Sequence, residues 1–128
     1  MKYFKKTIIF FISFILTSCV QEVHLKTVTF MVDMNAIEQP IDVGVRGNFT
    51  NISWNETILL TDENNDSIYE VTVSSETAVN QIEFKFVNGE NEYELKNFNN
   101  RVIQFEYKPE IITYEAVFNN PEEKITKN

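Results

Sequence analysis

Residues 81–87 read QIEFKFV, and their alternation decides the fold class. Ile82, Phe84 and Phe86 occupy every second position, and the residues between them are polar. Successive side chains of a β-strand point to opposite faces, so this period of two places the three apolar side chains on one side of a strand. A strand with one apolar face needs a second layer to cover it.

Five further segments alternate in the same way. They are TVTFMVDM at 27–34, IDVGVRGNF at 41–49, SIYEVTV at 67–73, RVIQFEY at 101–107 and IITYEAVF at 111–118. Their expected inward residues are Val28, Phe30, Val32 and Met34; Ile41, Val43 and Val45; Tyr69, Val71 and Val73; Ile103, Phe105 and Tyr107; and Ile112, Tyr114, Ala116 and Phe118. Turn clusters at 62–66, 88–92 and 97–100 separate these segments. No stretch of useful length has apolar residues at the spacing of a helix. A spacing of about ten residues per strand and turn predicts an all-β chain folded as a β-sandwich.

The first eighteen residues have the features of a secretory signal. Residues 1–6 carry three lysines and no acid, and a short apolar run follows at 7–17. The run is too short for a comfortable membrane span. LTSC at 16–19 resembles a bacterial lipobox, in which the cysteine is lipidated and becomes the new N-terminus. We expect lipidation of Cys19; the alternatives are an incidental cysteine after a signal peptide, or an uncleaved anchor.

These features divide the chain into four parts. We expect a lipoprotein signal peptide at 1–18, a lipidated tether at 19–26, a β-sandwich at 27–119 and a polar, disordered tail at 120–128. Cys19 is the single cysteine, so no intramolecular disulfide can form and packing alone stabilises one small domain. The expected location is the bacterial cell envelope, at the outer membrane or cell surface in preference to the inner membrane.

The charge balance excludes some partners. Removing Lys2, Lys5 and Lys6 from the 11 basic residues leaves 8 against 19 acidic ones, and the formal charge goes from −8 to −11. Nucleic-acid binding needs a basic footprint, so no nucleic acid is expected. The same balance disfavours electrostatic docking on anionic lipid, so the membrane link is expected to be the N-terminal lipid.

The candidate catalytic and metal-binding residues are few. His24 is the only histidine and lies in the expected tether, away from any site for a triad or a histidine base. Acidic residues are plentiful, so a glycosidase that uses two carboxylates stays open as an alternative. Most of them, however, lie in turns or at outward-facing strand positions, as expected of side chains that only face solvent. We predict no enzyme and no cofactor. Asp62, Asn64 and Asp66 alternate as in the opening of a calcium loop, but the central Gly and the twelfth-position Glu of an EF-hand are absent. A hairpin turn held by Asx hydrogen bonds explains the same residues more simply, and we predict no metal site.

The only tryptophan lies in a polar segment, RGNFTNISWNET at 46–57. A flat aromatic ring can stack on the apolar face of a sugar, while nearby amide and ammonium groups bind its hydroxyls. Lys85 lies on the opposite phase of its strand from Phe84 and Phe86, so its ammonium is expected to face outward. Trp54 is therefore either a platform for a ligand or a lid folded over the end of the sandwich.

The order of these motifs resembles the starch- and glycogen-binding module superfamily. The resemblance runs from about Val28 to Asn119 through VTFMVDM, VGVRGNF, the tryptophan, LLTDENNDSIYEVTV, IEFKFVNGENEYEL, NNRVIQF and AVFN. This order of motifs is similar to that of the family 20 and family 48 carbohydrate-binding modules and of the glycogen-binding domain of the AMP-activated kinase β subunit. This resemblance implies an immunoglobulin-like antiparallel β-sandwich that binds an oligosaccharide or polysaccharide, an α-glucan, without catalysis.

The resemblance also implies the residues of a sugar site. GNFTNISW resembles the family's Gly-x-Phe-Asn-x-Trp turn, which makes Trp54 the first aromatic platform. EFKFVNG resembles the family's Tyr-Lys-Phe strand and turn, which assigns Lys85, and Tyr93 is the nearest candidate for the second platform. NFNNR resembles the family's Asn-containing segment, so Asn99 or Asn100 supplies the amide. The alternative function is a structural or protein-interaction lipoprotein that binds partner proteins of the cell envelope and whose sandwich has lost sugar binding.

Overall fold

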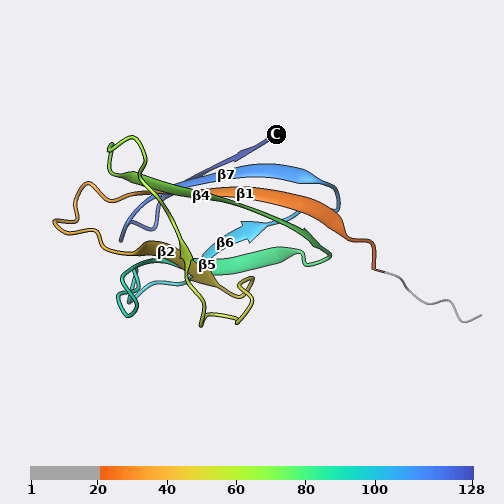
Figure 1. The fold of residues 1–128 in the computed structure, drawn as a ribbon. Helices are drawn as coiled ribbons and strands as arrows, with labels where there is room; N and C mark the ends of the chain where they lie inside the picture. Colours follow the sequence, from red (N-terminus) through yellow and green to blue (C-terminus); the bar gives the residue numbers. More distant parts are fainter. Residues whose placement is uncertain (1–20) are drawn as a thin grey trace, which may run out of the picture.

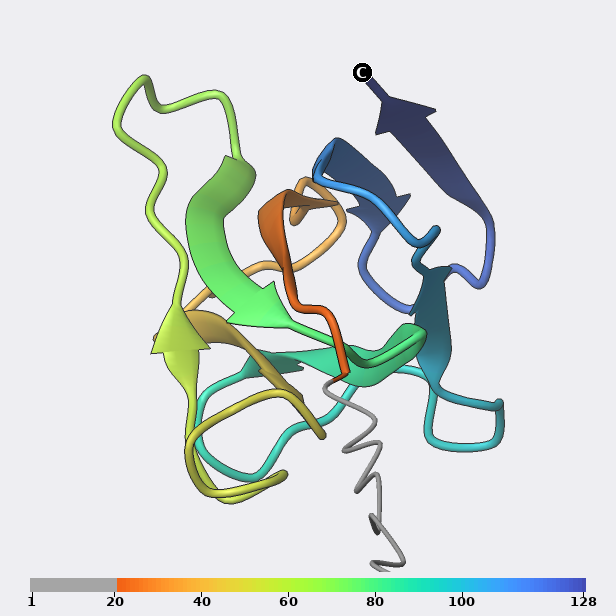
Figure 2. The same ribbon diagram turned by 90° about the vertical axis from the view of Figure 1, so that its right-hand side faces the viewer.

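The computed structural model describes residues 21–128, which form two four-stranded sheets packed face to face (Figures 1 and 2). The first sheet has the order β4 (Ile68–Thr77), β1 (His24–Asp33), β7 (Glu110–Val117), β8 (Glu123–Lys127). The second has the order β3 (Ile58–Leu59), β2 (Val43–Gly47), β5 (Gln81–Asn88), β6 (Arg101–Gln104). The predicted all-β sandwich is confirmed. The expected signal peptide and Cys19 lie outside the described residues.

Neighbouring strands are antiparallel except for one pair. β1 and β7 run parallel, with the register extending from Lys26 opposite Glu110 to Asp33 opposite Val117. The remaining pairs, from β1 with β4 to β5 with β6, are antiparallel. The expected antiparallel sandwich therefore holds with this single exception. Residues 21–128 contain no helix long and apolar enough to cross a membrane.

Aromatic rings from both sheets form the centre of the core. Phe30 on β1, Phe84 on β5 and Tyr114 on β7 are each 0% exposed. The Phe84 ring meets the Phe30 and Tyr114 rings edge to face, with centroids 4.9 Å apart in both pairs. This is a favoured geometry for aromatic pairs. The alternating apolar positions of the sequence thus point inward in β1, β5 and β7, as predicted.

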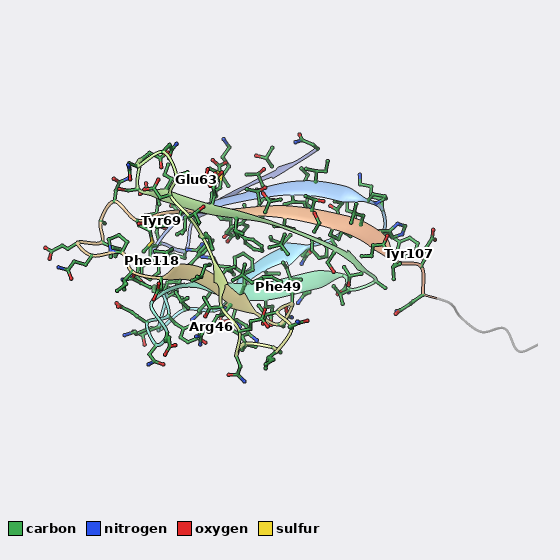
Figure 3. The ribbon with its side chains drawn as sticks, in the orientation of Figure 1. Arg46, Phe49, Glu63, Tyr69, Tyr107 and Phe118 are labelled. Atoms are coloured by element: carbon green, nitrogen blue, oxygen red, sulfur yellow. The ribbon has the colours of Figure 1, made fainter. Side chains whose placement is uncertain are left out.

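Two residues expected in the core lie outside it. Ile41 is 64% exposed and Tyr107 is 70% exposed. β2 begins only at Val43, because Asp42 takes a left-handed backbone conformation (φ 45°) that ends the extended segment, and β6 ends at Gln104. The Tyr107 ring instead packs edge-on against the His24 ring at the end of the sandwich where β1 begins (Figure 3).

The two ends of the domain differ from the expected boundaries. β1 begins at His24, so residues 24–26 belong to the sandwich and not to a tether. The inward Lys26 is buried, and its ammonium lies 2.8 Å from the Glu110 carboxylate, which offsets the cost of burying its charge.

The prediction of a disordered tail is wrong. Residues 123–127 form β8, which pairs with β7 from Ile112 opposite Lys127 to Ala116 opposite Glu123. Every residue of β8 is exposed, so this strand has no buried face to produce an alternating pattern. Backbone pairing with a partner strand holds it in place.

Candidate functional site

Five residues line a shallow hollow of about 450 Å³ beside the second sheet: Trp54, Lys85, Tyr93, Lys96 and Asn100. We call it the outer hollow. Its residues come from the β2–β3 connection, from the outward face of β5 and from the β5–β6 connection. The structure brings together Trp54, Lys85, Tyr93 and Asn100 of the predicted sugar site. Asn99 does not line the hollow, and Lys96 was not predicted.

The β2–β3 connection holds Trp54 in a defined place. The carbonyl oxygen of Gly47 accepts hydrogen bonds from the Trp54 N–H and the Thr50 hydroxyl, both at 2.9 Å. Trp54 has a φ of 63°, a left-handed conformation that costs an L-residue roughly 1–2 kcal/mol. Its side chain is half-buried at the edge of the hollow. Trp54 is therefore neither a fully exposed ring nor a core residue.

Tyr93 links the two connections that form the hollow. Its hydroxyl donates to the Trp54 carbonyl oxygen at 3.2 Å and accepts from Arg46 Nη1 at 3.1 Å. The Arg46 guanidinium also lies over the Tyr93 ring, 5.6 Å from its centroid, a cation–π geometry. Arg46 points away from the core on the outer side of β2 (Figure 3). One face of the Tyr93 ring is thus covered by Arg46.

Lys85 faces outward as predicted, but its ammonium is partly engaged. It donates to the carbonyl oxygens of Leu95 at 2.7 Å and Phe98 at 3.1 Å. An ammonium has three donors, so one remains for a ligand. Lys85 therefore both shapes the β5–β6 connection and contributes to the hollow.

A buried ion pair anchors the β5–β6 connection. Glu94 is 0% exposed, and its carboxylate lies 2.6 Å from Arg101 Nε. The same carboxylate accepts the backbone N–H of Phe86 at 3.0 Å and of Asn119 at 3.1 Å. Tyr93 and Lys96 lie on either side of this anchor along the chain, so the ion pair sets the position of one wall of the hollow.

The Tyr114 hydroxyl completes this buried network. Burial raises the pKa of Tyr114 to about 12, although the neighbouring Arg101 opposes the shift. The hydroxyl therefore keeps its proton near neutral pH. It can then donate to Glu123 at 3.1 Å, which ties β8 to the core.

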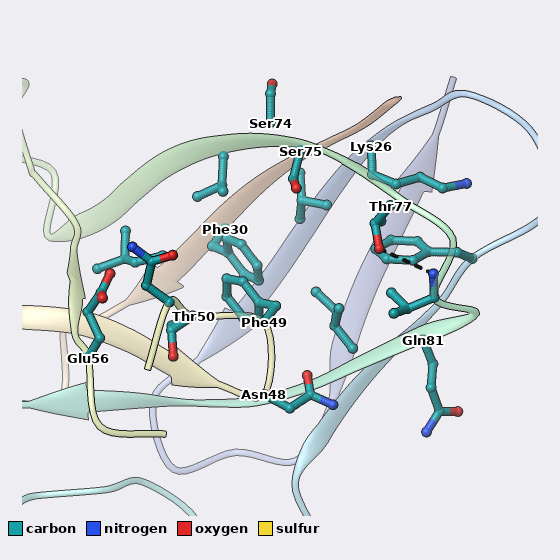
Figure 4. A pocket seen from close by; sticks show the side chains of 17 residues that line it. Lys26, Phe30, Asn48, Phe49, Thr50, Glu56, Ser74, Ser75, Thr77 and Gln81 are labelled. Atoms are coloured by element: carbon teal, nitrogen blue, oxygen red, sulfur yellow. Dashed lines mark hydrogen bonds between the residues drawn. The ribbon is translucent and has the colours of Figure 1, made fainter. Parts of the chain in front are cut away.

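A second hollow, of about 400 Å³, opens between the edges of the two sheets (Figure 4). Phe30 and Phe49 stack there with centroids 5.5 Å apart, so one face of each ring contacts the other ring. Lys26 borders this groove, but its ammonium is bonded to Glu110. None of the predicted sugar-site residues lines it. The outer hollow is therefore the candidate site.

The calcium alternative is not supported by the turn at 62–66. The Asp62 carboxylate accepts the backbone N–H of Asp66 at 3.1 Å and of Ser67 at 2.9 Å, as an Asx-bonded hairpin turn requires. A backbone hydrogen bond from Ile68 is the main cause of a lowered pKa of Asp66. Across residues 21–128, no group of three histidine, cysteine or acidic side chains is arranged to hold a metal ion.

Solved structures share this fold at low sequence identity. The CBM25-2 module of a β/α-amylase from Paenibacillus polymyxa matches with a TM-score of 0.50 and 17% identity, over 82% of this chain and 94% of that one. The CBM25-1 module of the same enzyme matches with a TM-score of 0.51 and 18% identity, over 81% of this chain and 93% of that one. The family 20 module of a maltotetraose-forming amylase from Pseudomonas saccharophila reaches only 0.49, at 18% identity and over 72% and 99% of the chains, too low to support an argument. No family model and no curated protein matches this chain. The resemblance predicted from sequence is thus confirmed in the fold.

Proposed function

We propose that this chain is a non-catalytic carbohydrate-binding domain that takes an α-glucan at the outer hollow. One observation carries the proposal: Trp54, Lys85, Tyr93 and Asn100 come from three separate segments of the chain and line a single hollow. The shared fold with modules of amylases agrees with it.

The chemistry of these groups suits a sugar. A glucose ring has an apolar face of C–H groups that the Trp54 ring can cover, and a rim of hydroxyls. The Asn100 amide and the remaining donor of Lys85 supply hydrogen bonds to that rim. A site of this size offers few contacts to offset the ordering cost of association, so we expect a dissociation constant on the order of micromolar to millimolar.

The backbone of Trp54 supports a functional role for its ring. A bulky residue in the left-handed region is an outlier, and glycine adopts this conformation without the same cost. Such strain persists only where the surroundings over-determine it, and strained residues cluster at ligand sites.

Glucan binding can be tested by retention on an amylose gel. We expect the full-length chain, in a detergent without a sugar headgroup, to be retarded relative to an inert protein of similar charge. Trp54→Ala should abolish the retardation at a cost of about 1–2 kcal/mol in stability, because the ring is only half-buried. Lys85→Ala should weaken it in part. Phe84→Ala, which empties the core, should cost roughly 3–5 kcal/mol.

A matched control is Tyr107→Ala, which removes an exposed aromatic ring beside His24, outside the outer hollow, and should leave retention unchanged. Wild-type chain that is not retarded on any α-glucan would favour the protein-interaction alternative. Trp54→Ala that is strongly destabilised yet still binds would identify Trp54 as a lid.

The proposal includes a lipid anchor at Cys19, with the domain held in the cell envelope at the outer membrane or cell surface. β1 begins at His24, so a covalent lipid at Cys19 would keep the sandwich close to its membrane. Mass spectrometry of the membrane fraction should find a lipidated peptide that starts at Cys19. An intact segment 1–18, or an unmodified Cys19, would refute this part of the proposal.

A further inference from the structure

The basic side chains of residues 21–128 fall into two groups. Five form ion pairs with acidic side chains: Lys26, Arg101, Lys108, Lys124 and Lys127. Within that part of the chain, Arg46, Lys85 and Lys96 form none. All three belong to the outer hollow or its immediate support: Lys85 and Lys96 line it, and Arg46 packs on Tyr93.

This gathering places like charges close to one another. Arg46 on β2 lies directly opposite Lys85 on β5, and both side chains face outward. Like charges at opposed positions of an antiparallel pair destabilise the sheet. An acidic residue at either position would remove the repulsion, and the chain has 19 of them.

Acidic side chains do occur nearby, but they leave these cations without an ion pair. Asp42, Glu56 and Glu90 border a neighbouring hollow together with Arg46. Glu83 lies two positions from Lys85 on the same strand. Within residues 21–128, the acidic side chains form ion pairs only with the other basic residues, and some form none. The positive charge beside Trp54 is therefore available to a ligand.

We propose that the sugar bound at the outer hollow carries an anionic group, a uronic acid carboxylate or a phosphate monoester. The inference rests on the proposed function and names the class of glycan that the site prefers. The sugar ring stacks on Trp54 and its hydroxyls keep the remaining donor of Lys85, while its anionic group accepts a hydrogen bond from Lys96. Hydrogen bonds between charged partners are about twice as strong as neutral ones.

The charge of the whole chain sharpens this selectivity. The formal net charge is −8, so an anionic polymer is repelled at long range and gains affinity only where local cations meet its charge. Adventitious adhesion of a polyanion to the general surface is correspondingly disfavoured.

Three polymers of matched chain length test the proposal: amylose, amylose oxidised to the carboxylate at C6, and amylose phosphorylated at C6. The full-length chain, in a detergent without a sugar headgroup, is titrated with each at low and high salt. We expect one or both anionic polymers to bind about tenfold more tightly than amylose at low salt, as a factor of ten corresponds to about one charge-assisted contact. High salt should reduce the ratio, because it screens partly exposed charges.

Variants tie the preference to the hollow. Lys96→Gln should reduce the ratio of affinities to near one, and Lys96→Arg should retain it. Lys124→Gln lowers the net charge by the same unit at an exposed site on β8, and should leave the ratio unchanged. The two anionic polymers separate a carboxylate preference from a phosphate preference.

The outcomes are distinct. Tighter binding of an anionic polymer that is lost in Lys96→Gln alone supports the proposal. Equal or weaker binding of both anionic polymers, with amylose still bound, overturns the anionic preference and leaves the proposed function standing. Equal losses in Lys96→Gln and Lys124→Gln also overturn it, because they show a general charge effect. Binding of none of the three overturns the glucan function itself.

Discussion

The substitution Glu94→Gln tests the anchor beneath the outer hollow. It removes one charge with little change in shape. The carboxylate accepts four hydrogen bonds: from Arg101 Nε at 2.6 Å, Arg101 Nη2 at 2.9 Å, Phe86 N–H at 3.0 Å and Asn119 N–H at 3.1 Å. Every partner is a donor, so the amide NH₂ of a glutamine must face a donor and two of the bonds are lost.

The size of the effect follows from these contacts. Hydrogen bonds to charged groups contribute roughly 1.5–3 kcal/mol each, and two of them give about 3–6 kcal/mol. A similar range, about 3–5 kcal/mol, is typical when one partner of a buried ion pair is removed and the other charge stays buried. Arg101 is only 3% exposed, so its charge stays buried when the partner is lost. Because single domains are stable by only about 5–15 kcal/mol, much of the stability should be lost.

Urea unfolding, followed by the fluorescence of the single tryptophan and by circular dichroism, measures this loss. The matched control is Glu92→Gln, an exposed glutamate on the same connection, which should change stability by less than about 0.5 kcal/mol. The double variant Glu94→Gln with Arg101→Met should recover part of the loss, because no unpaired charge remains buried. A loss below about 1 kcal/mol for Glu94→Gln would refute the assignment of this pair as the anchor.

Two further predictions concern acid stability and the support of Trp54. Burial raises the pKa of Glu110, but hydrogen bonds from Lys26, the Glu106 N–H and Lys127 outweigh it and leave the pKa below its ordinary value of 4.5. A lowered carboxyl pKa stabilises the fold above the unfolded value and loses that contribution as the pH falls. Glu110→Gln should therefore be less stable than wild type at about pH 7, with the difference shrinking towards about pH 3; a constant difference in urea unfolding would contradict this. Gly47→Ala places a Cβ against the Glu83 carbonyl oxygen and 2.9 Å from Phe84 Cβ, so it should cost about 1–3 kcal/mol in stability. The resulting shift of Trp54 should also weaken glucan binding. An unchanged melting temperature and unchanged binding would show that the added Cβ does not clash.

Sequence alone determined the fold class and most of the core. The period of two in β1, β5 and β7 is a local property, because side chains alternate along any strand, and Phe30, Phe84 and Tyr114 are buried as the pattern predicts. The resemblance in motif order located four of the residues that line the outer hollow. These positions follow from strand phase and from turn motifs, which are both readable within short segments.

Only the tertiary structure decided the ends of the sandwich and the charge of the site. β8 has no apolar face, and it exists because β7 offers an unpaired edge to its backbone. Lys26 can point inward because Glu110 approaches it from a distant strand. Arg46 and Lys96 look like ordinary surface cations in the sequence. Their position at or beside the outer hollow arises because sheet register and the buried Glu94–Arg101 pair bring separate segments together, and no local pattern encodes such a meeting.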